Sequence, residues 1–139
     1  MELPTDLLEE VVRRGQILHS DIFENIDHPK FFVVMGISEN KIAGFFYINS
    51  EINRYIQKKE EQLRMQYPLY VADYVFLAHD SYICATNIME LPKAVILKSI
   101  QENRTKIIDS LKPEHLTALL EKVRQSKLFS NVVKRRYFY

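Results

Sequence analysis

The sequence predicts one domain of the α+β class, in which a small curled antiparallel sheet or barrel carries helices on its outside. The chain has 139 residues, the size of a single domain. Hydrophobic residues make up 47% and charged residues 27%, which is typical of folded globular proteins. Short apolar runs rich in aromatic and β-branched residues alternate along the chain with segments of helical period.

The first part of the chain is expected to be mostly strand. A short helix over 5–12 precedes it, because Leu7, Leu8 and Val11 fall on one helical face. Strands are expected over 16–23, 30–37 and 42–48. The polar segment 38–41 joins the last two as a β-hairpin.

In the second part of the chain, segments with the helical period alternate with strand-like apolar segments. An amphipathic helix is expected over 51–66, with strands over 73–78 and 81–85. A short helix over 93–101 follows Pro92. Residues 104–108 are ambiguous and are expected as a short last strand. The longest helix begins at Pro113 and runs to about residue 129. Its shared apolar face consists of Leu116, Leu119, Leu120 and Val123.

Charge is unevenly distributed although the net charge is only +1. Residues 1–92 carry a net charge of −6, whereas residues 93–139 carry +7 and end in a basic tail at 134–139. Two interpretations stay open. The basic third is a surface for nucleic acid or a protein partner, or it consists of solvated helices that face water.

Several classes of protein are excluded. The longest purely apolar stretch, 31–35, is too short to span a membrane, and the start of the chain is not expected to act as a signal peptide. Cys84 is alone and cannot form an internal disulfide, which favours a cytoplasmic protein. No glycine-rich phosphate loop and no paired His or Cys spacing occur, so we expect neither a cofactor nor a metal site.

Three stretches resemble a known family. They are Arg-Gly-Gln-Ile at 14–17, His-Pro-Lys-Phe-Phe-Val-Val at 28–34 and Ser-Tyr-Ile-Cys-Ala-Thr-Asn-Ile at 81–88. A weaker match lies at 107–111. Together and in this order they resemble the PemK/MazF-like toxins, small SH3-like β-barrels that cleave RNA in bacterial toxin–antitoxin systems.

The resemblance implies a single PemK/MazF-like domain over 1–139, built as an antiparallel SH3-like barrel with helices, a helical insertion at 51–66 and a long C-terminal helix. It implies a metal-independent endoribonuclease toxin, with RNA and an antitoxin protein as partners and a possible homodimer. The chain departs from the family at His28, where the family usually has a catalytic Arg, and at Asp109, where it has Gly. The alternative is therefore a catalytically inactive barrel that binds RNA or protein.

Three residues are candidates for catalysis. RNA cleavage without metal needs a base, an acid and a cation, and His and Arg suit these roles. His28 is the candidate acid or base, or else a surface histidine. By resemblance Ser50 contacts the scissile phosphate, although it also suits the N-cap of the 51–66 helix. Arg14 is the candidate electrostatic stabiliser, or a solvated residue at a helix end.

Four further residues are expected to bind RNA: Asn49, His79, Lys30 and Tyr82. Asn49 stands beside Ser50. Tyr82 is one of several tyrosines that either stack on bases or pack within the sheet. The pair His79–Asp80 suggests a catalytic arrangement, but sequence neighbours on a strand point to opposite faces. A simple turn, in which Asp80 bonds its own backbone, is the other interpretation.

Overall fold

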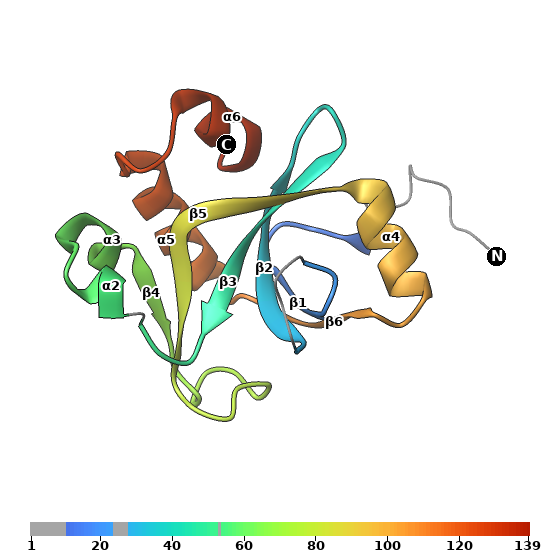
Figure 1. Ribbon diagram of the computed structural model, residues 1–139, viewed down its shortest axis with the longest axis horizontal. Helices are drawn as coiled ribbons and strands as arrows, with labels where there is room; N and C mark the ends of the chain where they lie inside the picture. The colour runs from blue at the N-terminus through green and yellow to red at the C-terminus, as the bar shows by residue number, and fades with distance from the viewer. Residues whose placement is uncertain (1–10, 24–27, 53) are drawn as a thin grey trace.

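An antiparallel sheet forms the centre of the computed structural model, which describes residues 11–23, 28–52 and 54–139 (Figure 1). The strands are β1 Gln16–Ser20, β2 Lys30–Ile37, β3 Ile42–Asn49, β4 Gln66–Leu69, β5 Ser81–Pro92 and β6 Thr105–Ser110. The helices are α2 Arg54–Gln57, α3 Glu60–Arg64, α4 Lys93–Gln101, α5 Pro113–Gln125 and α6 Asn131–Tyr137. The class is therefore α+β, as the sequence predicts.

The sheet is open. Its strand order is β4-β5-β3-β2-β1-β6, and all neighbours run antiparallel. Within the described residues the two edge strands, β4 and β6, do not pair with each other. The sheet is thus curled but not closed into a barrel, which corrects that part of the sequence expectation.

Strand β5 bends sharply, and the bend curls the sheet. Phe45 of β3 pairs with Met89, but Tyr47 of β3 pairs with Cys84, so β5 advances five residues while β3 advances two. Extra residues of this kind form a bulge that bends a strand and increases its twist. Figure 1 shows the bend, with β4 beside the first segment of β5 and α4 beyond the last.

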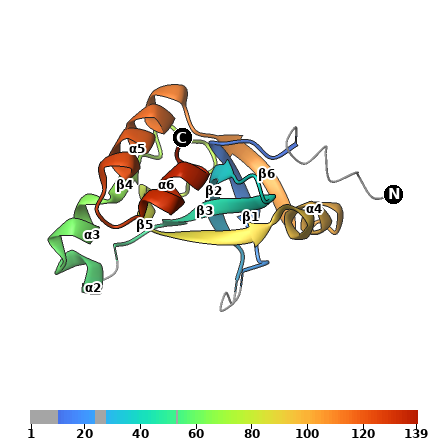
Figure 2. The same ribbon diagram turned by 90° about the horizontal axis from the view of Figure 1, so that it is seen from above.

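Alternating side chains give the sheet two buried faces. On one face Val33, Met35 and Phe46 pack with apolar residues of α5 and α6. On the other face Phe32 and Phe45 pack with apolar residues of α4. We call these the α5–α6 face and the α4 face; Figure 2 shows α5 and α6 together over the first of them.

Helix α6 approaches the sheet at a pair of glycines. Gly36 of β2 and Gly44 of β3 face each other across the two strands, and Tyr137 lies over both and is fully buried. A Cβ atom at Gly36 would stand 2.6 Å from the Tyr137 carbonyl oxygen, and one at Gly44 would stand 2.8 Å from its ring. Only glycine therefore leaves room for α6 at this depth.

Two arginines hold the end of α6. Arg14 donates from Nε to the carbonyl of Met35 at 2.7 Å and from Nη2 to the carbonyls of Tyr137 and Tyr139 at 3.0 Å. Arg124 of α5 donates to the carbonyl of Phe138. The last carbonyls of a helix lack partners within the helix, so the two guanidinium groups satisfy them. Burial, and then the charge of Arg124, lower the pKa of Arg14.

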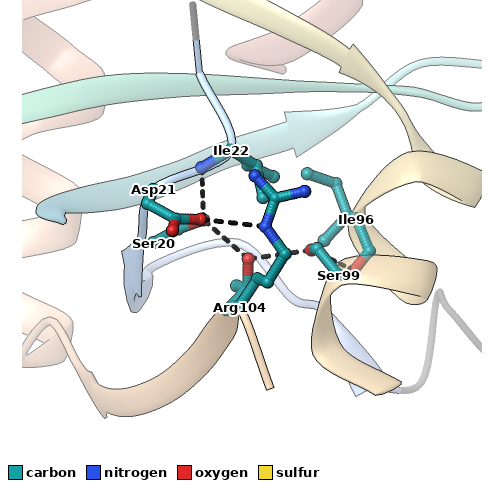
Figure 3. Close-up of polar contacts among 7 residues, drawn as sticks. Ser20, Asp21, Ile22, Ile96, Ser99 and Arg104 are labelled. Carbon is teal, nitrogen blue, oxygen red and sulfur yellow. Dashed lines mark hydrogen bonds and ion pairs between the residues drawn. The ribbon is translucent and has the colours of Figure 1, made fainter. Parts of the chain in front are cut away.

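A cluster of buried hydroxyl groups joins α4 to the sheet (Figure 3). Ser20 and Thr105 lie 2.6 Å apart between β1 and β6, and Ser99 of α4 lies 2.8 Å from Thr105. Ser99 also contacts the carbonyl of Ile96 at 2.7 Å. All three hydroxyls are buried and hydrogen-bonded, which avoids the cost of an unsatisfied polar group.

Two expected elements are wrong in the middle of the chain. The helix expected over 51–66 is two short helices, because the backbone at Lys59 is extended and the chain turns there. Residues 73–78, expected as a strand, form a loop with turns. The strand that precedes β5 in the chain is instead β4, at Gln66–Leu69. Pro68 within β4 masked that strand, since proline is confined to edge strands such as this one.

The ends of the chain also differ from expectation. The helix expected over 5–12 falls largely outside the described residues, and the first strand ends at Ser20. The long helix ends at Gln125, and α6 follows with Ser130 as its N-cap, accepting from the Val133 N–H. The expected basic tail at 134–139 thus forms the end of α6, where Phe138 is buried.

We expect Gly36→Ala and Gly44→Ala each to lower the free energy of unfolding by about 1–3 kcal/mol, the usual cost of overpacking a core. Both added methyl groups would overlap Tyr137. Urea denaturation followed by circular dichroism measures the effect.

The variant Tyr137→Ala provides the control. The methyl at Gly44 overlaps the tyrosine ring, so its cost should shrink when the ring is absent. The methyl at Gly36 overlaps the main chain of Tyr137, so its cost should persist. For Gly44→Ala, an equal cost in both backgrounds would contradict the overlap with the Tyr137 ring.

Alkaline pH should destabilise the chain through Tyr137. Burial raises the pKa of Tyr137, and its hydrogen bond to Glu90 raises it further. A raised pKa contributes stability that is complete below the unfolded value of about 10 and is lost as pH rises towards the folded value. We expect the free energy of unfolding to fall between about pH 10 and 11.5, and to fall less in Tyr137→Phe; parallel falls would refute this.

Candidate functional site

A pocket of about 710 Å³ lies at one end of the sheet. Three segments meet there: the start of β2, the end of β3, and the loop before β5. The residues that line it are His28, Pro29, Lys30, Phe31, Tyr47, Ile48, Asn49, Ser50, Glu51, Phe76, Leu77, Ala78, His79 and Ser81. Its volume is within the range of ligand-binding pockets.

Three groups that can carry positive charge line this pocket. His28 and Lys30 flank the start of β2, and His79 comes from the loop before β5. The Nζ atom of Lys30 lies 5.4 Å from the centre of the Tyr47 ring. That contact holds the ammonium group over an aromatic face. Burial raises the pKa of Tyr47.

Asn49 and Ser50 bring hydrogen-bonding groups to the same pocket. Helix α2 begins only at Arg54, so Ser50 does not occupy the N-cap position that the sequence suggested. Ser50 is one of the residues that line the pocket. Glu51 adds a carboxylate beside it.

Aromatic and aliphatic side chains complete the wall. The rings of Phe31 and Phe76 lie 5.0 Å apart between β2 and the loop. Leu77 is buried beside them. An apolar wall opposite cationic and polar groups suits a ligand that has both a flat ring and an anionic group.

The loop over 70–80 is tied to α5 through Tyr74. The Tyr74 hydroxyl lies 2.6 Å from Nδ1 of His115 and accepts a hydrogen bond from the Lys112 N–H at 3.0 Å. Burial, more than any other cause, raises the pKa of Tyr74. The Tyr74 side chain is buried and its ring contacts Phe76, so this bonding fixes one wall of the pocket.

The base of the loop is closed by a second set of bonds. Asp80 accepts from the Val71 N–H at 2.8 Å, and Ser81 donates to the His79 carbonyl at 3.0 Å. Asp80 thus uses its carboxylate to close the loop rather than to bond its own backbone. The side chain of His79 is exposed at the pocket.

Five of the residues predicted from the sequence share the pocket: His28, Ser50, Asn49, His79 and Lys30. Tyr82 lies just outside, in an adjoining hollow that includes Ser50.

Arg14 does not line the pocket. It contacts Met35 near the far end of β2 and holds the end of α6, so its role in the structure is to stabilise the fold. The carbonyls of α6 that it satisfies are more than a hundred residues away in the chain, which no local pattern indicates.

The sequence did not point to Glu51, Phe76 or Ser81 as pocket residues. Phe76 lies within residues 73–78, which the sequence predicts as a strand and which form a loop in the structure. Their positions could have located Glu51 and Ser81. Glu51 follows Ser50 just beyond the strand expected over 42–48, and Ser81 follows Asp80 at the start of the strand expected over 81–85.

No group of three or more His, Cys, Asp or Glu side chains is placed to hold a metal ion in the described part of the chain. Of the described helices, none is long and apolar enough to cross a lipid bilayer.

No protein-family model matches this sequence, and no curated protein is significantly similar to it. The function must therefore be inferred from the pocket itself.

We expect Tyr74→Phe to lower the free energy of unfolding by about 1–3 kcal/mol, because it leaves the Lys112 N–H without its partner. Amide hydrogen exchange over 70–80 should accelerate, since the loop loses its tie to α5. Tyr70→Phe is the matched control, because Tyr70 is 52% exposed on the same loop. Equal exchange in the two variants would exclude the anchoring role.

Proposed function

We propose that this chain is a metal-independent endoribonuclease and that the pocket at the end of the sheet is its active site. One observation carries the proposal: His28 and Lys30 at the start of β2 and His79 from the loop before β5 line one pocket, which Asn49 and Ser50 also line. Two imidazoles and an ammonium group are sufficient for RNA cleavage by the neighbouring 2′-hydroxyl.

The reaction needs no group from outside the pocket. One histidine takes the proton of the 2′-hydroxyl, and the 2′-oxygen forms a bond to phosphorus. The bond from phosphorus to the 5′-oxygen breaks, and the other histidine, as imidazolium, gives that oxygen a proton. The products are a 2′,3′-cyclic phosphate and a 5′-hydroxyl. Lys30, with the donors of Asn49 and Ser50, stabilises the charge on the non-bridging oxygens.

The wider identity that we propose follows from the resemblance in the sequence. Residues 14–17, 28–34 and 81–88 resemble the PemK/MazF-like toxins. We accordingly propose an SH3-like fold of that family, a role as toxin in a toxin–antitoxin system, and an antitoxin protein as partner, with a homodimer as the possible assembly. In this proposal Lys30 supplies the positive charge that the family takes from the arginine replaced by His28.

A second candidate function is RNA binding without cleavage. The observation that favours it is the position of Arg14, which the structure commits to the end of α6. Without an arginine at the pocket, the site has one permanent cation and two histidines. In that case the same groups hold a phosphate and do not cleave its ester.

The test is cleavage of a long structured RNA by the purified protein in EDTA, analysed on a gel. The wild type should yield discrete fragments ending in cyclic phosphate. We expect His28→Ala and His79→Ala each to reduce the rate by about 100- to 10,000-fold, the range for the loss of a general acid or base. Ser50→Ala should also cleave more slowly.

Matched controls lie outside the pocket. His19→Ala removes the same residue type as the two histidine variants, and Lys106→Ala removes a lysine from the surface. Neither residue lines the pocket. Both should cleave at the wild-type rate. Fragments of equal intensity in every variant would reject this site. Intact RNA with a salt-sensitive gel shift would reject cleavage in favour of the binding function.

A further inference from the structure

A second hollow adjoins the pocket, and we call it the side hollow. Its volume is about 320 Å³, and its lining residues are Ser50, Glu51, Ile52, Gln57 and Tyr82. Ser50 and Glu51 line both the side hollow and the pocket. A ligand that passes Ser50 in the pocket therefore reaches the side hollow directly.

Lys30, Asn49 and Tyr82 form a row across three strands that leads to the side hollow. Asn49 pairs with Tyr82, and Phe31 pairs with Ile48, so Lys30 stands opposite Asn49. All three side chains lie on the α4 face, because opposite residues of paired strands share a face. The row begins with a cation and ends with an aromatic ring, as in sites that track a single strand of nucleic acid.

Two side chains bring acceptor oxygens to the side hollow, Glu51 and Gln57. Gln57 donates from Nε2 to the carbonyl of Ile52 at 2.9 Å, which orients its amide and leaves Oε1 as an acceptor. Glu51 contributes a carboxylate, which only accepts when ionised. Tyr82 is half-buried and offers a ring face for stacking. A nucleobase with an exocyclic amino group meets these acceptors with donors, as carboxylates accept from the amino group of cytosine.

We propose that the side hollow is a base-selective subsite for the nucleotide next to the one held at Ser50. It stacks the base on Tyr82 and favours amino-bearing bases over uracil through Glu51 and Gln57. The substrate is accordingly a single strand, since a paired base has its Watson–Crick edge occupied. This inference rests on the proposed function, because it assumes that the pocket holds RNA.

The experiment compares two RNA hexamers, all-cytidine and all-uridine, each 2′-O-methylated throughout so that no 2′-hydroxyl can attack. The two bases have the same size and differ at position 4, an amino group in cytosine and a carbonyl oxygen in uracil, and at N3, which accepts in cytosine and donates in uracil. Fluorescence anisotropy at constant salt gives the dissociation constants. Because one good base contact discriminates by about 1–3 kcal/mol, the wild type should bind the cytidine hexamer about 5- to 100-fold more tightly.

Variants separate the parts of the subsite. Glu51→Gln should reduce the preference for cytidine, since it replaces an acceptor with a donor. Tyr82→Ala should weaken binding of both hexamers by about 5- to 100-fold, whereas Tyr82→Phe should keep the stacking and the affinity. Tyr55→Ala is the matched control. Tyr55 is on α2, is 72% exposed and does not line the side hollow.

The outcomes distinguish this inference from the proposed function. Equal affinity of the wild type for both hexamers, or a preference that survives Glu51→Gln, would overturn the subsite while leaving cleavage at the pocket in place. Binding that is unchanged in Tyr82→Ala would do the same. If the wild type neither binds these hexamers nor cleaves RNA, the proposed function fails and the subsite fails with it.

Discussion

The contact between Tyr137 and the glycine pair of β2 and β3 determines how the rest of the molecule is arranged. Because Gly36 and Gly44 lack side chains, α6 lies directly on the strands, and Tyr137 is fully buried. Arg14 then joins the end of α6 to the main chain of β2. Helix α6 thereby covers part of the α5–α6 face of the sheet. As a result the guanidinium group of Arg14 serves the fold, and the pocket takes its positive charge from Lys30.

The pocket itself lies beyond the ends of the strands, at the other end of β2. Its floor belongs to β2 and β3, whereas one wall belongs to the loop that carries Phe76 and His79. That loop has no strand to hold it, and its position depends on the bonds of the Tyr74 hydroxyl to α5. Helix α5 packs on the same face of the sheet as α6. The wall and the floor are therefore fixed to one common core.

Local pattern was sufficient wherever neighbouring residues decide the structure. The apolar runs of β2 and β3 and the helical period of α4 and α5 all appear where the sequence places them, and the strand ends bring Lys30 and Asn49 into the pocket. The pattern failed where distant partners decide. Residues 73–78 are a short, mainly apolar run of the kind that forms a strand, but Tyr74 contacts His115 and Phe76 contacts Phe31. The position of α6 on the sheet likewise depends on Gly36 and Gly44, which are far from α6 in the chain.

The bulge in β5 divides the strand into two segments with separate partners. Residues 81–84 pair with β4, and Tyr82 among them lines the side hollow. Residues 89–92 pair with the start of β3 beside α4. Between them the extra residues can absorb a change in length or angle. Side chains at one end of β5 can thus change without altering the packing of α4 at the other end. A strand continuous in its pairing would transmit every such change along its length.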